Sequence, residues 1–405
     1  MTRSAGNVRL RSARIAAGYT SQNALAEALG VGVRQVRRWE SATPPTPHPE
    51  VGQRLAQMLG QTLEQLGFAP DHVGQPRQVM LAAAVGSALA VVPSEAAASM
   101  QPATVARDYE AVTRSHRRLY WSVAPSMLHP AAIAHATLGC ALLPQTAGET
   151  RRRIASALAE TYLLAGRVEF FDQQEPDAAA ATLTHALQAA GEADDVLLGA
   201  AILAHSAFIP GWAGLRDKAV ERMIAARTYA RRGPAPAALW AWLDAVEAEC
   251  ETRCGNTATA LHLIRHAEET LAGGAAGEVP EWFDWFTPGR LAAFKGNTQL
   301  TAGHLPQART TLLNALDQLE PTEEKQRAVL LGDLAAVEAA AGEPEAACRN
   351  AVQALEQLER TWYATGMDRV TEVRRALAPY QNERCVRDLD DRLYGWRTTV
   401  SALAR

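Results

Sequence analysis

A short pattern of small residues recurs five times between residues 174 and 358, and it limits what this chain can fold into. Each copy opens on glycine, or on glutamine in the first copy, and has alanine five positions later. The openings are Gln174, Gly214, Gly255, Gly303 and Gly342, and the alanines are Ala179, Ala219, Ala260, Ala308 and Ala347. Apolar or small residues follow 4, 7 and 11 positions after each alanine, which places them on one helical face. The pattern predicts a turn followed by an amphipathic helix, repeated every 39–48 residues.

A second set of small residues indicates that each of these helices has a partner. Seven positions before the last four openings stand Ala207, Ala248, Gly296 and Ala335. A small residue there lets the helix before the turn pack closely against the helix after it. Because one pair cannot bury its own apolar face, the pairs over residues 150–379 are expected to stack into a curved solenoid with a concave surface. A generic alanine-rich helical bundle is the alternative interpretation, since alanine is abundant enough to match such patterns by chance.

Hydrophobic periodicity beyond residue 100 is helical almost throughout, with no convincing strand alternation, so we expect an all-α protein. The longest apolar segment, residues 80–92, has only 13 residues and is too short to span a membrane. We expect it to be a buried or interdomain helix. The five cysteines are few and odd in number, which favours free thiols in the cytoplasm.

The charges are distributed unevenly along the chain. Residues 1–41 contain seven arginines against two glutamates, a formal charge of +5, whereas the whole chain has −4, which leaves −9 for the remainder. A small basic head on a large acidic body is typical of a nucleic-acid-binding module attached to a different domain.

The basic head divides into short helices. In the first, over residues 8–18, Val8, Leu10, Ile15 and Ala16 can form an apolar stripe, and Gly18 ends it.

The second helix of the head is expected to follow Ser21, a plausible N-cap. Leu25 and Leu29 lie one turn apart on one face, Ala26 is small where two helices would cross, and Gly30 suits the left-handed position after the helix.

The third helix follows a turn of about three residues. Its Val36 and Trp39 would face inward, while Arg34, Arg37 and Arg38 would point away. This is the pattern of a helix-turn-helix, in which the apolar residues seat the helix on its domain and the arginines face a DNA groove. An amphipathic helix pair with a solvated arginine face is the alternative.

The spacing Q-x-x-L-A-x-x-L-G-V-x-x-x-x-V-x-x-W-E, residues 22–40, resembles the λ-repressor-like (XRE) helix-turn-helix family. The resemblance covers roughly residues 8–68 and implies a five-helix domain. It also implies that Trp39 belongs to the core and that Glu40 pairs internally with Arg14. The DNA-binding residues that it implies are Gln22, Val33, Arg34, Gln35, Arg37 and Arg38.

Two features depart from the family's pattern. The turn before Gln22 has one residue more than usual. Val33 stands where polar residues are more common, which predicts apolar contact with a thymine methyl group or little readout at that base.

Proline and glycine mark the expected boundaries between domains. Prolines at 44, 45, 47 and 49 prevent a helix over residues 41–50, and residues 69–78 are rich in proline, glycine and charge. The resemblance places the closing helices of the head over residues 49–68. We therefore expect a DNA-binding domain over 1–68, a linker with an apolar helix over 69–103, and a repeat domain over 104–405.

The offsets within the repeats resemble those of the tetratricopeptide repeat, although their period exceeds the usual ~34 residues. An XRE head joined to such repeats resembles peptide-responsive transcriptional regulators. This resemblance implies a peptide or small-molecule effector in the concave groove. Asn297, Asn314 and Asn350 would then hold a peptide backbone through their amides.

Residues 279–290 form an insertion between two repeats, and four of the five residues from 282 to 286 are aromatic. Trp282 and Trp285 could wall a ligand pocket, or the segment could simply plug the core between repeats.

Little in the chain indicates catalysis. No glycine-rich phosphate loop and no HExxH, GxSxG or CxxC motif occurs. Cys250, Cys254, His262 and His266 flank one turn, but their spacing fits no zinc site that we can justify. We therefore expect no enzyme, cofactor or metal.

These features together predict a cytoplasmic regulator that binds double-stranded operator DNA as a homodimer and responds to an effector. The alternative is a tetratricopeptide-like scaffold that docks a protein partner, with the helix-turn-helix only localising it to DNA.

Overall fold

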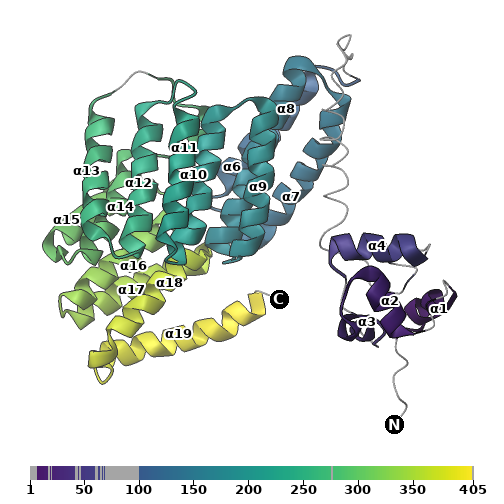
Figure 1. The fold of residues 1–405 in the computed structure, drawn as a ribbon. Coiled ribbons are helices and arrows are strands. Elements are labelled where there is room, and N and C mark those ends of the chain that lie inside the picture. The colour runs from purple at the N-terminus through teal and green to yellow at the C-terminus, as the bar shows by residue number, and fades with distance from the viewer. Residues whose placement is uncertain are drawn as a thin grey trace. The chain divides into compact units, whose positions relative to one another are not determined.

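The structure is a computed structural model of the 405-residue chain (Figure 1). It describes residues 7–16, 19, 21–41, 44, 47–59, 63, 66, 68, 100–274 and 277–403. The chain separates into two compact units, residues 1–94 and 95–405. The regular structure of the described residues is helical without strands, so the predicted all-α class is confirmed.

The first unit is the basic head. Its described helices are α1 (Val8–Ala16), α2 (Gln22–Leu29), α3 (Val33–Trp39) and α4 (Pro49–Leu59). The predicted caps of α2 are confirmed, because Ser21 Oγ accepts a hydrogen bond from the Ala24 amide at 3.1 Å and Gly30 has φ +68°. The expected fifth helix falls mostly outside the described residues. The same holds for the linker and apolar helix over 69–103, of which only 100–103 are described.

One expectation for the head was wrong. Ile15 is 51% exposed, and the inward positions of α1 are taken by Leu10, Ala13 and Arg14, because Arg14 reaches a carboxylate on the far side of the core. The closing helices of the head were expected from Pro49 onward, and α4 begins at this residue. Proline is tolerated in the first turn of a helix, where its missing amide would have no intrahelical partner.

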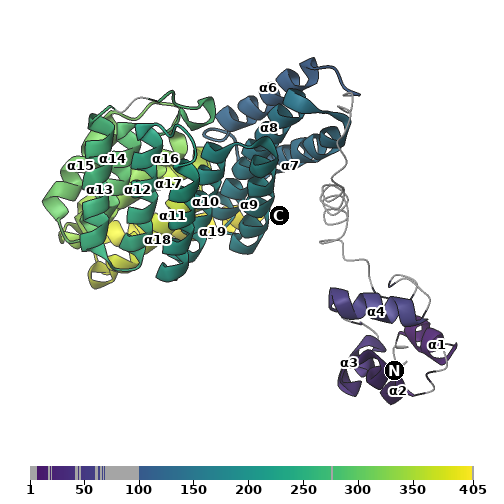
Figure 2. The same cartoon turned by 45° about the horizontal axis from the view of Figure 1, so that its top comes forward.

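The second unit begins with α6 (Thr104–Leu119) and α7 (Pro125–Leu142) and continues as stacked helix pairs (Figures 1 and 2). We call the first helix of each pair an A helix and the second a B helix. The A helices are α8 (Gly148–Arg167), α10 (Val196–Trp212), α12 (Ala237–Arg253), α14 (Pro288–Thr301), α16 (Glu324–Ala340) and α18 (Ala364–Ala376). The B helices are α9 (Pro176–Ala193), α11 (Arg216–Ala230), α13 (Thr257–Ala272), α15 (Leu305–Asp317), α17 (Pro344–Arg360) and α19 (Arg384–Leu403).

The repeating pattern of the sequence corresponds to the turn inside each of the first five pairs. The opening glycines have φ between +72° and +82°, and Gln174 takes the same left-handed conformation with φ +59°. Glycine suits this position because it has no Cβ to clash with the backbone. The alanines five residues later are at most 1% exposed, so they form the contact between the B helix and its neighbours.

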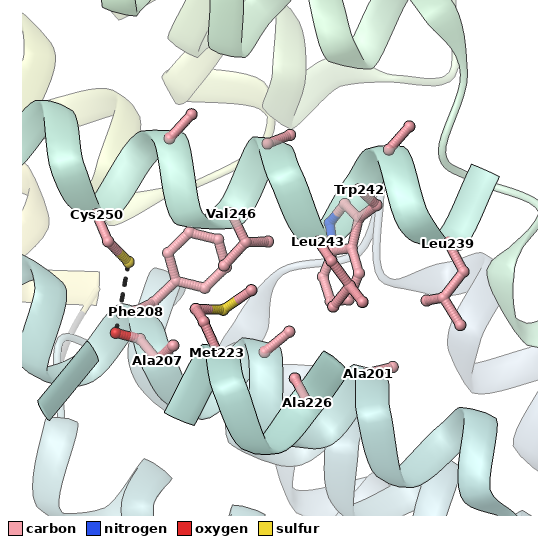
Figure 3. Close-up of a cluster of buried hydrophobic side chains, with 14 of the residues drawn as sticks. Ala201, Ala207, Phe208, Met223, Ala226, Leu239, Trp242, Leu243, Val246 and Cys250 are labelled. Carbon is pink, nitrogen blue, oxygen red and sulfur yellow. Dashed lines mark hydrogen bonds between the residues drawn. The ribbon is translucent and has the colours of Figure 1, made fainter. Parts of the chain in front are cut away.

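Small residues let neighbouring helices approach closely, both within a pair and between pairs. Ala207 on α10 is fully buried, and the Cys250 thiol of the next A helix, α12, lies 3.6 Å from the Ala207 carbonyl oxygen (Figure 3). Met223 and Ala226 of α11 complete this part of the core together with Trp242 of α12.

The stack of pairs curves until its two ends meet on the inner side. α8 continues into η3 (Val168–Asp172), a π-helical segment. Asp172 accepts a hydrogen bond from Lys325 of α16 at 2.5 Å, and its carbonyl oxygen accepts one from Trp362 at 3.3 Å. Thr365 at the start of α18 donates to the Phe171 carbonyl oxygen at 3.1 Å. These contacts join residues 153–194 positions apart in the chain, so the solenoid closes around its concave face.

One described helix, Pro125–Gln145, is long and apolar enough to cross a membrane when judged by length and composition. Core helices pass the same test. In this structure the helix packs on α6, where the Tyr109 hydroxyl donates to the His135 carbonyl at 3.0 Å and the two rings stack at 4.0 Å.

Candidate functional site

The first candidate surface is the outer face of α3 in the head. Val36 and Trp39 are at most 1% exposed and belong to the core of the head, as predicted. Arg34, Arg37 and Arg38 lie on the opposite side and are exposed. None of these three guanidinium groups forms an ion pair within the described part of the chain. They are therefore free to bind phosphates or base edges.

The orientation of α3 is fixed by a buried polar network. Glu40 follows α3 and accepts from Arg14 Nε at 2.7 Å, so the predicted Arg14–Glu40 ion pair is confirmed. Glu40 also accepts from Gln22 Nε2 at 2.6 Å, and Arg14 donates to the Tyr19 carbonyl at 2.6 Å. The network ties α1, the start of α2 and the end of α3 together.

The remaining predicted DNA-binding residues differ in their surroundings. The amide nitrogen of Gln22 is engaged by Glu40, which leaves its amide oxygen and second N–H for another partner. Val33 is partly buried and packs against the core of the head, whereas Gln35 is exposed. Five of the six residues thus lie on α3 and one lies at the start of α2.

The second candidate site is a cavity on the concave face of the solenoid. Its volume is about 130 Å³. Nine of the 20 lining residues are Phe, Trp or Tyr, although the chain as a whole has only 6% of these residues. The lining comes from the A helices, from the segments flanking them and from the end of α6, and no B helix contributes to it. Such a concave, aromatic and mostly apolar surface is typical of small-molecule sites.

Arg167, the last residue of α8, lies among aromatic rings at this cavity. Its guanidinium carbon is 4.6 Å from the ring centre of Tyr120, 5.5 Å from Trp121 and 5.0 Å from Trp285. The residue immediately precedes the π-helical segment η3. π-Helical turns occur frequently at functional sites.

Two further arginines of the cavity have carboxylate partners. Arg290 lies 2.7 Å from Glu323 and stacks on Trp121 at 4.0 Å. Burial lowers the pKa of Arg290, and Glu323 opposes this effect.

The other arginine is Arg369, which lies 2.9 Å from Asp333 and 3.7 Å from Glu249. Burial raises the pKa of Asp333 to about 6 in spite of Arg369.

His205 and Trp212 of α10 complete the polar side of the cavity. Burial, followed by the nearby charge of Arg167, lowers the pKa of His205 to about 3, so its ring is neutral near pH 7. Its Nδ1 is 2.9 Å from the Ala201 carbonyl, which can only accept, so Nδ1 carries the proton and Nε2 remains an acceptor. The Trp212 Nε1–H is buried without an acceptor among the described residues.

The predicted ligand-binding residues are only partly brought together. Trp285 and Asn297 line the cavity, with the Asn297 amide donating to Glu249 at 2.8 Å. Trp282 lines a smaller neighbouring pocket that shares Arg167, His205 and Trp285 with the main cavity. Asn314 and Asn350 are on the B helices α15 and α17, outside the cavity lining.

The aromatic insertion contributes to the core and also to the lining of the cavity. Phe283 and Phe286 are 1% and 7% exposed and fill the core between repeats. Trp285 instead reaches the cavity, where it lies 5.8 Å from Trp242 and 6.4 Å from Trp121.

The cysteines and histidines near Gly255 have other surroundings than a shared ligand. Burial raises the pKa of Cys250, which disfavours the thiolate that binds metals. His266 Nδ1 instead lies 2.6 Å from Asp244. No group of three potential metal ligands occurs within the ranges that the structure describes.

Comparison with known families supports the interpretation of the head. Residues 10–66 match the helix-turn-helix family HTH_3, the XRE type. The chain therefore has the DNA-binding domain of a transcriptional regulator at its amino-terminal end. No curated protein matches the chain. The family match does not extend to the helix pairs, whose resemblance to tetratricopeptide repeats stays a prediction.

Sequence reasoning did not identify Arg167, His205, Trp212 and Arg369 as residues of a site. They lie in helices whose alanine-rich pattern indicated packing alone. The sequence nevertheless contained an indication of these residues. The A helices are buried on two faces, so an arginine or tryptophan in such a helix must line an internal surface or have a polar partner.

Proposed function

We propose that this protein is a cytoplasmic transcriptional regulator whose head binds operator DNA through α3 and whose helix pairs bind an effector. The observation that carries the proposal is the orientation of α3, with Val36 and Trp39 in the core and, outside, three arginines that form no ion pair with a described residue. The helix-turn-helix family match over residues 10–66 supports it.

The head would read its site with few contacts, because a domain of this size buries a small area on DNA. Such modules reach useful affinity when two copies bind a site with two-fold symmetry. We therefore propose a homodimer whose contacts come from the helical unit, with residues 1–68 as the DNA-binding domain and 104–405 as the effector domain.

The cavity supports the effector part of the proposal. It is concave and aromatic, and it is formed by segments from residue 120 to residue 369. A ligand that contacts all of these segments would favour one curvature of the solenoid over another. Ligand binding could then change the affinity for DNA if the two curvatures differ in that affinity.

Footprinting of the full-length protein on genomic DNA fragments tests the DNA-binding part. The double variant Arg34→Gln, Arg37→Gln should lose at least tenfold in selectivity, since each arginine–guanine contact contributes about 1–3 kcal/mol of discrimination. Arg54→Gln is the matched control, because Arg54 is exposed on α4 of the same head. Binding should also weaken with salt on a log–log slope of about −0.9 per neutralised phosphate. A protein with no preference for any fragment over random DNA would contradict the proposal.

A further inference from the structure

The cationic side chains at the cavity differ in whether a carboxylate lies beside them. Arg290 and Arg369 have carboxylate partners at 2.7 and 2.9 Å, and Lys325 is paired with Asp172 at 2.5 Å. Arg167 forms no ion pair with any described residue, and its Nε is buried without an acceptor.

An arginine held among aromatic rings, away from bulk water, interacts strongly with an anion that enters the same space. A carboxylate matches the planar donor fork of guanidinium.

The walls of the cavity indicate the rest of the ligand. Trp121, Trp212, Trp242 and Trp285 line it, and flat apolar faces of this kind favour a planar aromatic body. Its volume of about 130 Å³ leaves room for a small ligand, and one or two fused rings with a carboxylate would fit it.

Two polar groups add specificity within the aromatic walls. The Nε2 atom of neutral His205 accepts a hydrogen bond, and the buried Nε1–H of Trp212 donates one. A ring N–H or hydroxyl group on the ligand would satisfy His205.

We propose that the cavity binds a small aromatic carboxylic acid, with the carboxylate on Arg167 and the ring between the tryptophans. This inference rests on the proposed effector role of the cavity and names the chemical class of the effector.

Calorimetric titration of the full-length protein with indole-3-carboxylate tests the inference, with indole-3-carboxamide as the neutral probe of the same shape. The acid should bind at least tenfold more tightly than the amide. Arg167→Gln should weaken binding of the acid at least tenfold and abolish the preference for the acid over the amide. Arg167→Lys keeps the charge but not the planar fork, so its affinity for the acid should lie between those of the wild type and Arg167→Gln. Arg151→Gln is the matched control, because Arg151 is on the same helix and pairs with Glu192 outside the cavity.

Equal affinity for acid and amide, no heat with the acid at millimolar concentration, or unchanged acid binding in folded Arg167→Gln or Arg167→Lys would overturn the inference. Failure of the DNA-binding proposal can be distinguished from failure of this inference. The variant Arg34→Gln, Arg37→Gln should bind the acid as the wild type does. A protein that selects operator DNA but shows no preference for the acid would still be a regulator, but one with an effector of another chemical class.

Discussion

Glu40 shows how a single side chain determines the surface that α3 presents. Its carboxylate is 6% exposed and accepts from Arg14 and Gln22, which come from α1 and α2. The apolar core of the head holds α3 in place. The hydrogen bonds of Glu40 with Arg14 and Gln22 fix the rotation of the C-terminal end of α3 relative to α1 and α2. A buried ion pair is a costly way to stabilise a domain, because both charges lose their hydration. Removing only one of the two partners lowers the stability further, because the other charge then stays buried without compensation.

We predict that Glu40→Gln destabilises the head by about 2–3 kcal/mol, because Arg14 is left buried without a counter-charge. Hydrogen–deuterium exchange of peptides from residues 8–40 in the full-length protein measures this change. Glu27→Gln, at an exposed position of α2, should leave the exchange unaltered. Equal protection in both variants would show that the network contributes nothing to the head.

We also predict that acid destabilises the helical unit through His135. Burial, followed by the charge of His116, lowers the pKa of His135 to about 4, and its Nε2 is 2.9 Å from Thr113 Oγ1. Because the folded state prefers the neutral ring, this contribution to stability is fully present above about pH 6.5 and is lost as the pH falls towards 4.

Urea unfolding at pH 6.5 and pH 4.5 measures the effect. The wild type should lose about 2 kcal/mol more over this interval than His135→Gln does. His262→Gln is the control, since His262 is exposed on α13, and it should keep the wild-type slope. Parallel pH profiles for the wild type and His135→Gln would exclude His135 as the cause.

At the scale of the helices, the A and B helices differ in what covers them. B helices bury one face through the alanines that follow each turn, and they leave the other face to solvent. A helices are covered by a B helix on one side and face the cavity or the next A helix on the other. The close approach within a pair therefore depends on a small residue in the A helix, which is Gly296 in α14.

We predict that Gly296→Ala destabilises the helical unit by about 1–3 kcal/mol, because an added Cβ would meet the Leu312 side chain of α15 within contact distance. Alanine is the better helix former, so this sign opposes helix propensity. Gly191→Ala is the matched control, because nothing lies within 4 Å of its Cβ position on α9, and it should stabilise by up to about 1 kcal/mol. Thermal unfolding of both variants distinguishes overpacking from propensity, and stabilisation by both would contradict the packing interpretation.

At the scale of the whole helical unit, closure of the solenoid depends on a buried pair from distant parts of the chain. Lys325 and Asp172 are at most 1% exposed as side chains, and the Lys325 ammonium group lies 3.8 Å from the ring centre of Tyr120. Burial lowers the pKa of Lys325 and raises that of Asp172, and each charge opposes the effect on the other. The pair joins η3 to α16 beside the cavity, so the shape of the cavity depends on it.

We predict that Lys325→Met destabilises the helical unit by about 3–5 kcal/mol, because Asp172 stays buried but loses the ammonium group that pairs with it. The double variant Lys325→Met, Asp172→Asn should recover part of this loss. Lys295→Met, which breaks a partly exposed pair with Glu268, should cost at most about 1 kcal/mol. Urea unfolding gives these energies, and equal losses in the single and double variants would show that the two residues act independently.

Much of the fold could be predicted from residue patterns because these patterns are local. The turn inside each pair needs a left-handed residue, and the buried faces of α2, α3 and the B helices repeat with helical spacing. Ile15 was predicted wrongly because apolarity alone cannot show that Arg14 takes the inward position to reach Glu40. In the cavity, Trp285 and Asn297 were predicted, but Asn314 and Asn350 lie on B helices outside its lining.

The sequence by itself determined that the protein is all-α, that a basic helix-turn-helix precedes stacked helix pairs, and which side of α3 is charged. These properties follow from the spacing of residues within one or two helical turns. Only the tertiary structure decided that residues from Tyr120 to Arg369 surround one cavity and that Arg167 forms no ion pair with any described residue there. The reason is that small rotations between successive pairs add up to the curvature of the solenoid, and no local pattern records their sum.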